Sequence, residues 1–326
     1  MTKRKSIWQG YGGMTAAGIS TFLGAPVLEN VEEKELRSRN IKAAVFGVPF
    51  DGATLSRTGS SMGPRGIRNA SAYFGHYHVD YDVNIFRKLN LHDCGDSFIA
   101  LGDAKETMEN GASFAAEILK AGAMPVILGG EHTVTLAGTL GVDKALKGNY
   151  GFIHFDAHLD AQPATPNALQ WFHGSQVAQT AGLKAFRGEN MVLIGMRGTT
   201  NPQSHWEFCK EKGITVFTMR QVLDIGLEKV VDRALEIATK GTDGYYLSID
   251  MDVLDPAFVP GAEAFTPFGL TLRELWLVLP KLGANEKLKA FDVVEVVPRY
   301  DPSELTALTA AGIVVELLAA KATTMP

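Results

Sequence analysis

The feature that most constrains the fold is a regular alternation of short apolar runs with longer helical segments, from residue 41 onward. The apolar runs are almost continuous in Val, Ile, Leu and Phe, which is typical of strands covered on both faces. Seven strands are expected: Ala43–Val48, Pro125–Leu128, Gly151–Phe155, Met191–Ile194, Thr215–Phe217, Tyr245–Ile249 and Phe291–Val296. Strands that alternate with helices predict a parallel sheet between helical layers, a three-layer α/β fold.

The helical segments carry their own end signals. Three helices are expected, over Ala104–Lys120, Leu272–Leu279 and Glu304–Lys321. Asp103 is placed to cap the first, whereas Thr271 and Glu274 have the spacing of a capping box at the head of the second, with Pro280 near its end. Ligands of such open sheets bind beyond the carboxyl ends of the strands, so we expect the chemistry there.

Composition limits the class of protein. The chain has 326 residues, 46% hydrophobic and 21% charged, and no Pro-, Gly- or Ser-rich linker divides it. We therefore expect one domain over residues 1–326, with about residues 1–40 forming an amino-terminal extension used in packing or subunit contacts. The net charge is −5 and the basic residues are scattered. This pattern argues against a nucleic-acid partner.

Targeting and redox signals are weak. Lys3–Lys5 imitate the start of a signal peptide, but no apolar run follows them, and no segment approaches a membrane span of about 20 apolar residues. Cys94 and Cys209 are far apart and outside any CxxC pair, so neither a disulfide framework nor a thiolate metal site is expected. We expect a cytoplasmic protein with no membrane partner.

Ligand-type side chains follow three of the predicted strands where each strand ends. Six residues form this set: His132, Asp156, His158, Asp160, Asp250 and Asp252. Alternate residues of an extended chain point the same way, so the Asp-x-His-x-Asp and Asp-x-Asp groups can each converge on one side. A lone strand-end aspartate is usually a solvated loop residue or a helix cap. Three such strand ends together would gather negative charge that is strongly unfavourable without cations.

The ligand chemistry narrows the metal and the reaction. Four carboxylates and two imidazoles, with no thiolate, suit Mn²⁺ or another hard to borderline ion better than structural zinc. Six ligands, with Asp156 and Asp250 each able to bridge, are compatible with two ions about 3.5 Å apart. Such a pair lowers the pKa of a bridging water and gives a hydroxide nucleophile near neutral pH. The expected reaction is attack of metal-activated water on an electrophilic centre.

Set together, these segments resemble the signatures of the ureohydrolase (arginase/agmatinase) superfamily, in particular its agmatinase-like branch. Three motifs carry the resemblance: Gly129-Gly130-Glu131-His132, His154-Phe155-Asp156-Ala157-His158-Leu159-Asp160 and Ser248-Ile249-Asp250-Met251-Asp252-Val253-Leu254-Asp255-Pro256. Three more look similar: Pro49-Phe50-Asp51-Gly52, Gly63-Pro64-Arg65-Gly66-Ile67-Arg68 and Asp292-Val293-Val294-Glu295-Val296. The resemblance implies a three-layer α/β domain around a mostly parallel eight-stranded sheet, usually assembled into hexamers.

The resemblance also implies roles for individual residues. His132 and Asp160 would hold one ion, His158 and Asp252 the other, and Asp156 and Asp250 would bridge them. Glu295 would receive a guanidinium group, for which a strand-end carboxylate is independently well suited. His173 would carry protons to the leaving amine, and Asp160 is counted with these two as catalytic. The implied reaction is hydrolysis of a guanidino C–N bond, releasing urea and an amine.

Five other histidines receive no ligand role. His154 shares the parity of Asp156, but the resemblance does not make it a ligand, so we interpret it as a core residue or a neighbour of the ligands. The remaining four are interpreted as surface or packing residues: His76, His78, His92 and His205.

Two loops depart from the agmatinase-type pattern and leave the substrate open. The aspartate motif is followed by Pro260-Gly261-Ala262-Glu263-Ala264-Phe265-Thr266-Pro267-Phe268-Gly269 in place of a Pro-Gly-Thr-Gly-Thr-Pro stretch. Near His173, the changed loop includes Trp171. We hypothesise that Trp171, Phe265 and Phe268 narrow the pocket and face a compact cation, each such contact being worth about 0.5–2 kcal/mol. The substrate would then be guanidine, a substituted guanidine or a biguanide. Alternatively, the rings pack at a subunit contact.

Several alternatives stay open. An ordinary agmatinase or guanidino-acid hydrolase fits the same ligands, and Ni²⁺ is the alternative to Mn²⁺ because the ligand set does not separate them. A single-zinc deacylase has fewer carboxylates, and a phosphoesterase would need a basic group for phosphate. A homo-oligomer (trimer or hexamer) is expected, and a mainly structural subunit of a hetero-oligomer remains the alternative from another class.

Overall fold

The computed structural model describes residues 20–164 and 170–325. Its centre is an eight-stranded sheet in the order β4-β1-β5-β10-β9-β6-β7-β8, in which every neighbouring pair is parallel. The strands are β1 (Ala43–Val48), β4 (His92–Asp96), β5 (Met124–Gly129), β6 (Tyr150–Phe155), β7 (Phe186–Met196), β8 (Thr215–Thr218), β9 (Gly244–Asp250) and β10 (Leu288–Val294). A separate hairpin pairs β2 (Tyr77–His78) with β3 (Val83–Asn84).

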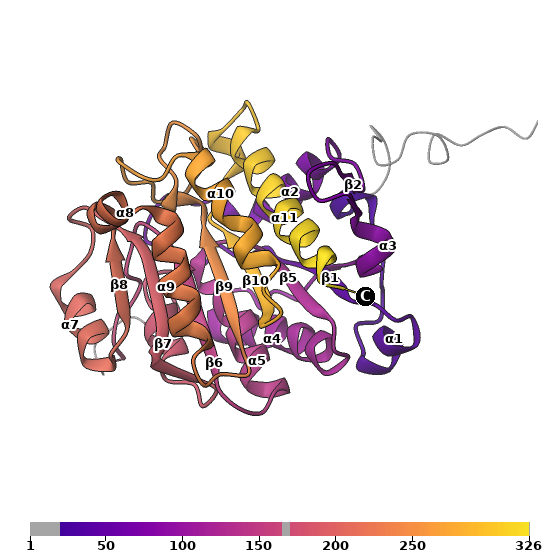
Figure 1. Ribbon diagram of the computed structural model, residues 1–326, viewed down its shortest axis with the longest axis horizontal. Helices are drawn as coiled ribbons and strands as arrows, with labels where there is room; N and C mark the ends of the chain where they lie inside the picture. The colour runs from indigo at the N-terminus through magenta and orange to yellow at the C-terminus, as the bar shows by residue number, and fades with distance from the viewer. Residues whose placement is uncertain (1–19, 165–169, 326) are drawn as a thin grey trace, which may run out of the picture.

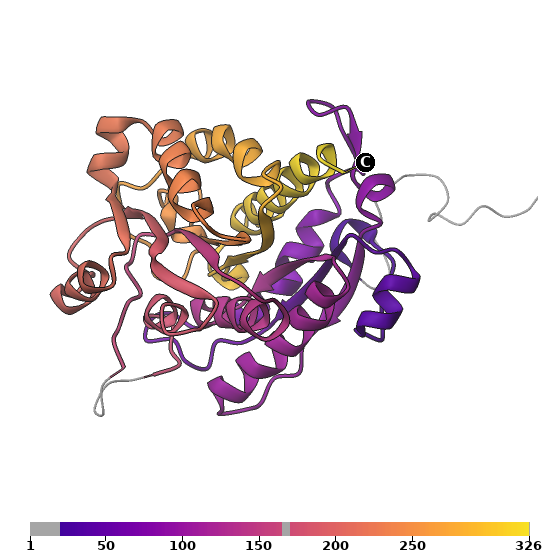
Figure 2. The same ribbon diagram turned by 60° about the horizontal axis from the view of Figure 1, so that its bottom comes forward.

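Helices cover both faces of the sheet (Figures 1 and 2). One layer contains α2 (Gly63–Ser71), α8 (Met219–Ile225), α9 (Leu227–Thr239), α10 (Leu272–Gly283) and α11 (Leu305–Thr323). The opposite layer is built mainly from α4 (Ala104–Lys120) and α5 (Thr135–Ala145). The shorter helices are α1 (Glu33–Ser38), α3 (Ile85–Leu89), α6 (Gln176–Thr180) and α7 (Gln203–Lys212). The predicted three-layer α/β fold is therefore confirmed.

Alternation along the strands explains why the apolar runs are continuous. In β1, Ala43 and Val45 join the core beneath α9, α10 and α11, whereas Ala44 and Phe46 join the core beneath α4. The same alternation divides β6, where Ile153 faces the first layer and its neighbours face the second. Because successive side chains point to opposite faces and both faces are covered, most positions in these strands are apolar.

The predicted elements are found, with three corrections. Strand β10 ends at Val294 and not at Val296, because Glu295 takes a left-handed backbone conformation (φ 69°). Helix α11 begins after Glu304, which is also left-handed (φ 57°). Strand β4 was not expected, because its sequence His-Asp-Cys-Gly-Asp is polar and lies at the sheet edge.

The predicted helix caps are present. Asp103 accepts a hydrogen bond from the backbone N–H of Glu106 (2.9 Å). Thr271 and Glu274 form a reciprocal capping box at the start of α10, which continues through Pro280 to Gly283. These caps satisfy backbone N–H groups that the first helical turn leaves without partners.

The amino-terminal segment and the last helix both pack into the core. From residue 20 onward, Leu23, Leu28 and Leu36 are buried, and the role of the amino-terminal extension stays a prediction. Residues 1–19, which include Lys3–Lys5, lie outside the described residues. Helix α11 corrects the expectation that no apolar segment reaches membrane-spanning length: it has 19 residues and a mean hydropathy of 1.6. However, 78% of its apolar window is buried inside the fold, which accounts for this composition.

Candidate active site

The predicted ligands lie at the ends of three central strands, β5, β6 and β9, and Glu295 follows the fourth, β10. Strands β5, β10, β9 and β6 are in register, so that Leu128, Val293, Ile249 and Phe155 form one row across them. The chain therefore leaves all four strands at the same level, and the side chains that follow are brought together. The carboxyl ends of these parallel strands form one edge of the sheet. In open α/β sheets a ligand usually binds at this edge, where consecutive strands lie on opposite sides of the site.

A close approach of the backbone supports this edge. The N–H of Gly130 donates to the carbonyl of Val48 (3.0 Å), and the N–H of Glu131 donates to that of Phe50 (2.9 Å). A Cβ atom at Gly130 would lie 2.0 Å from the Phe50 carbonyl oxygen. The glycine in front of Glu131-His132 is thus required for the two loops to meet.

The first group of predicted ligands surrounds His132. Its Nδ1 atom lies 2.8 Å from Oδ2 of Asp250, 3.1 Å from Oδ2 of Asp156 and 3.3 Å from Oδ2 of Asp160. The His132 ring is 1% exposed and comes from the turn that follows β5. Three carboxylate oxygens from two other strand ends thus face one imidazole nitrogen.

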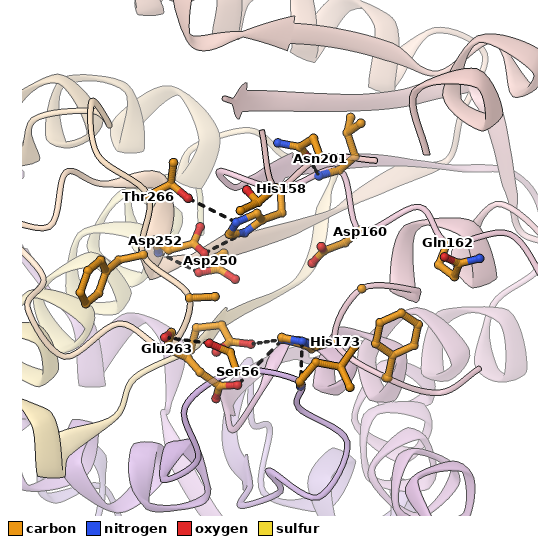
Figure 3. A pocket seen from close by; sticks show the side chains of 18 of the residues that line it. Ser56, His158, Asp160, Gln162, His173, Asn201, Asp250, Asp252, Glu263 and Thr266 are labelled. Atoms are coloured by element: carbon orange, nitrogen blue, oxygen red, sulfur yellow. Dashed lines mark hydrogen bonds and ion pairs between the residues drawn. The ribbon is translucent and has the colours of Figure 1, made fainter. Parts of the chain in front are cut away.

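The second group surrounds His158. Its Nδ1 atom lies 3.0 Å from Oδ2 of Asp252 and 3.4 Å from Oδ1 of Asp156. Asp156 therefore contacts His132 with one carboxylate oxygen and His158 with the other, so it lies between the two groups. Figure 3 shows His158, Asp160, Asp250 and Asp252 around one cavity. All six predicted ligands are brought together.

The hydrogen bonds of His132 indicate what its Nδ1 atom can bind. Ser248 donates its hydroxyl hydrogen to Asp292 (2.8 Å), so we infer that its oxygen accepts the Nε2–H of His132 (3.1 Å). In the neutral ring, Nδ1 then carries a lone pair directed at three carboxylates. Among the described residues, Nδ1 of His132, Oδ2 of Asp156 and Oδ2 of Asp252 form no hydrogen bond of good geometry and face only imidazole nitrogens and carboxylate oxygens. Buried lone pairs that face one another are unfavourable unless a cation or proton lies between them, so the donor set fits divalent ions.

The close packing of buried imidazoles and carboxylates also shifts the pKa values of these side chains. Burial disfavours the charged imidazole of His132, but the neighbouring carboxylates outweigh it and raise its pKa well above the ordinary value. The pKa of His158 is likewise raised to about 12 by Asp252 and Asp156, against the effect of burial. Burial, together with Asp252 and Asp156, raises the pKa of Asp250. In the protein alone, protons would thus occupy the positions that cations fit.

Two residues for which no role was predicted, Gln176 and Asn201, hold the ligand loop in place. Gln176 donates to Oδ2 of Asp160 (2.5 Å), and Asn201 accepts the backbone N–H of Leu159 (2.7 Å). His154 is fully buried, with its Nε2 atom 2.9 Å from Oδ2 of Asp156. With His132, Asp156 and Asp160, His154 forms a cluster whose ligand atoms lie close enough to hold an ion, so its place outside the ligand set stays a prediction. Asp160 adopts a left-handed backbone conformation (φ 45°), as Glu295 does, and such strain is concentrated at functional sites.

A cavity of about 670 Å³ opens over these residues, and His173 lies in its wall. The backbone N–H of Leu55 donates to Nε2 of His173 (3.0 Å), which leaves the ring proton on Nδ1. That Nδ1 atom lies 3.8 Å from Oε1 of Glu295 and 3.9 Å from Oε1 of Glu263. Figure 3 shows His173 and Glu263 close together in the wall of the cavity.

Glu295 is positioned by the ligand loop itself. Its Oε1 atom accepts the backbone N–H of His132 (2.7 Å), and its Oε2 atom has no hydrogen-bond partner among the described residues. Burial, followed by the charges of Glu263, Asp250 and Glu131, raises the pKa of Glu295 well above its usual value. A buried carboxylate oxygen of this kind can accept an N–H from a bound cation.

The predicted aromatic lining is only partly present. Phe265 lines the cavity, but the guanidinium of Arg57 lies 4.4 Å from its ring centre and covers one face. Phe268 is 84% exposed, and Trp171 packs against the core beneath α4, so both lie outside the residues that line the cavity. A cavity of this volume also exceeds the size of a guanidinium ion. Trp171 and Phe268 therefore do not narrow the cavity.

The other histidines follow the sequence interpretation with one addition. His76 stacks on Phe86 and His78 pairs with Glu316 (3.0 Å), both away from the cavity. His205, expected to be a packing residue, lines the cavity and lies 3.2 Å from Gln162. No sequence signal distinguished it, because α7 carries no strand-end motif.

Comparisons with known proteins identify the family to which the chain is related. The model of the arginase family matches residues 41–320. The agmatinase of Enterobacter sp. (strain 638) is 36% identical over 277 residues, which cover 84% of this chain and 85% of that protein. Among solved structures, proclavaminate amidino hydrolase from Streptomyces clavuligerus is 30% identical with a TM-score of 0.84, covering 94% of this chain and 98% of that one.

Formimidoylglutamase from Bacillus subtilis shares 26% identity with a TM-score of 0.81, over 86% of this chain and 88% of that one. The named relatives thus differ among themselves in the compound that they act on, while fold and family agree. The chain belongs to the arginase family of hydrolases that act on C–N bonds.

Proposed function

We propose that this chain hydrolyses the C–N bond of a compact guanidino compound, releasing urea or a urea derivative together with an amine or ammonia. The observation that carries the proposal is the convergence of six ligand-type side chains, the free carboxylate oxygen of Glu295 and the Nδ1–H of His173 on one cavity. The family membership supports the reaction class.

Six residues would hold two divalent ions: His132 with Asp160, His158 with Asp252, and Asp156 and Asp250 between the two. Bound there, such ions would supply Lewis acidity and a water activated near neutral pH. Mn²⁺ fits this oxygen-rich set, and Ni²⁺ is the alternative. Contacts of both Asp156 oxygens with different histidines support this partition.

The chain's own groups would bind the substrate and move the proton. Glu295 would accept N–H groups of the guanidinium through its free Oε2 atom. His173 would donate its Nδ1 proton to the leaving nitrogen as an imidazolium, which returns to the neutral ring. The ring would first take up a proton from the attacking water at Nε2, which requires release of the Leu55 N–H from that atom. Asp160, held by Gln176, would fix the position of the ions relative to these two groups.

Other readings make different predictions. An ordinary agmatinase or guanidino-acid hydrolase would prefer a substrate with a long tail, for which the cavity has room. A mainly structural subunit would bind no ions and cleave nothing. We further propose one ureohydrolase domain over the whole chain, assembled into a homo-oligomer. A location in the cytoplasm stays a prediction.

A panel of guanidino compounds tests the proposal. Protein loaded with Mn²⁺ or Ni²⁺ is incubated with guanidine, biguanides, agmatine and guanidino acids, and urea and amine release are measured. We expect cleavage of at least one of them. His173→Ala should lower kcat by about 10²- to 10⁴-fold with unchanged metal content. Full activity in that variant would refute the proton-transfer role, and turnover of acetyl-lysine or a phosphoester alone would refute the reaction class.

A further inference from the structure

A second carboxylate faces the place where the substrate would bind. Glu263, in the loop after β9, has a fully buried side chain and lines the cavity. Its Oε1 atom and Oε1 of Glu295 both lie within 4 Å of the same atom, Nδ1 of His173. Two buried carboxylates therefore flank the group that would protonate the leaving nitrogen (Figure 3).

The partners of Glu263 do not neutralise its charge. The Thr54 hydroxyl donates to Oε1 of Glu263, and the Ser60 hydroxyl donates to Oε2 (2.6 Å). Arg57 is close, but it donates to the backbone carbonyl of Glu263, and its guanidinium lies between two aromatic rings. Within residues 20–164 and 170–325, no Lys or Arg forms an ion pair with this carboxylate. A buried anion with only neutral donors is unfavourable until a cation joins it.

We propose that Glu263 is a specificity-determining residue that accepts an N–H on the leaving-nitrogen side of the substrate. This inference rests on the proposed function. A guanidinium ion carries N–H groups along every edge of its plane, so Glu295 can bind one edge and Glu263 another. Glu263 would thus select substrates that are compact planar cations. Such a substrate has either an unsubstituted leaving nitrogen, as in guanidine, or a further N–H-rich group beyond that nitrogen, as in a biguanide.

The same arrangement disfavours alkylguanidines. An alkyl group on the leaving nitrogen would place methylene groups against Glu263, and its buried charge would lose a hydrogen bond. Sites built to bind a substrate N–H reject analogues without it far more strongly than sites that discriminate by size. Selection by charge and hydrogen bonding also suits a cavity that is too large to select by size.

The alternative is that Glu263 only ties two loops together through Thr54 and Ser60. Two variants separate these roles. Glu263→Gln removes the charge and retains an oxygen that can accept a hydroxyl, whereas Ser60→Ala removes a loop contact and leaves the carboxylate. Ser60 is buried and is not among the residues that line the cavity, so it is a matched control.

The test is kcat/KM for guanidine and for agmatine in the wild type and both variants, loaded with the same metal. Glu263→Gln should lower the guanidine value by about 10- to 150-fold, as expected for a charge-assisted hydrogen bond, and leave the agmatine value within about threefold. Ser60→Ala should change both values by the same factor. Equal changes for both substrates in Glu263→Gln, or a wild type that prefers agmatine, would overturn the inference.

Failure of the proposed function would be recognised separately. If the wild type cleaves neither compound, binding of guanidinium chloride is measured by calorimetry in the wild type and in Glu263→Gln. Weaker binding in the variant by about tenfold or more supports the role of Glu263 even without catalysis. Unchanged binding overturns it.

Discussion

Ser248 offers the most informative substitution, because it is hydrogen-bonded to the candidate ligand His132 and does not line the cavity. Its hydroxyl connects Nε2 of His132 (3.1 Å) to Asp292 (2.8 Å), and all three side chains are buried. Ser248→Ala removes only the oxygen atom and leaves the Nε2–H of His132 without an acceptor. An unsatisfied buried donor costs about 1–3 kcal/mol, so the free energy of unfolding should fall by that amount.

Metal binding should weaken as well. Loss of the group that orients a ligating histidine typically lowers metal affinity by about 10- to 100-fold. The assay is calorimetric titration of metal-free protein with Mn²⁺ or Ni²⁺. Tyr246→Phe is the control: the Tyr246 hydroxyl also donates to Asp292 (2.6 Å) but does not touch His132. It should lose stability and keep its affinity within about threefold. Wild-type affinity in Ser248→Ala, or equal weakening in both variants, would refute the reasoning.

Further predictions concern protons and a helix cap. Because His132 and His158 both have raised pKa values, with that of His158 at about 12, and the pKa of Asp250 is raised as well, metal binding near pH 7.5 should release at least about two protons per chain. Affinity should therefore rise with pH, and titrations in two buffers of different ionisation heat measure the release; a value near zero contradicts the assignment. Thr271→Ala removes the cap of α10 and should cost about 1 kcal/mol in urea unfolding without affecting metal binding. An unchanged midpoint would refute the role of the cap.

The strands could be predicted from sequence because burial on both faces leaves continuous apolar runs. Strand β4 lacks that signal, since an edge strand needs less apolar cover and two of its five residues are exposed. The end of β10 was misjudged because the turn at Glu295 is imposed by its hydrogen bonds to Gly130 and His132, which join distant segments. The local amino-acid composition does not reveal such contacts between distant segments.

The convergence of the six candidate ligands could be predicted because their spacing repeats the period of the strands that present them. The residues that orient the ligands could not: Ser248 and Asp292 look like ordinary strand residues until β9 and β10 are paired. The aromatic lining failed for a related reason. Trp171 and Phe268 both have left-handed backbone conformations (φ 60° and 68°), which set the direction of their side chains. No local sequence pattern predicts these conformations. Glu263 was noticed only as a change in a loop, and its position opposite Glu295 emerges from the fold.

The number of tightly bound ions per chain tests the central claim most directly. Metal-free protein is dialysed against Mn²⁺ or Ni²⁺, and the bound metal is counted by elemental analysis. The two groups around His132 and His158 predict two ions per wild-type chain, and about one in His132→Ala, in which the His158 group is intact. One ion or none in the wild type, or two in His132→Ala, would contradict the account.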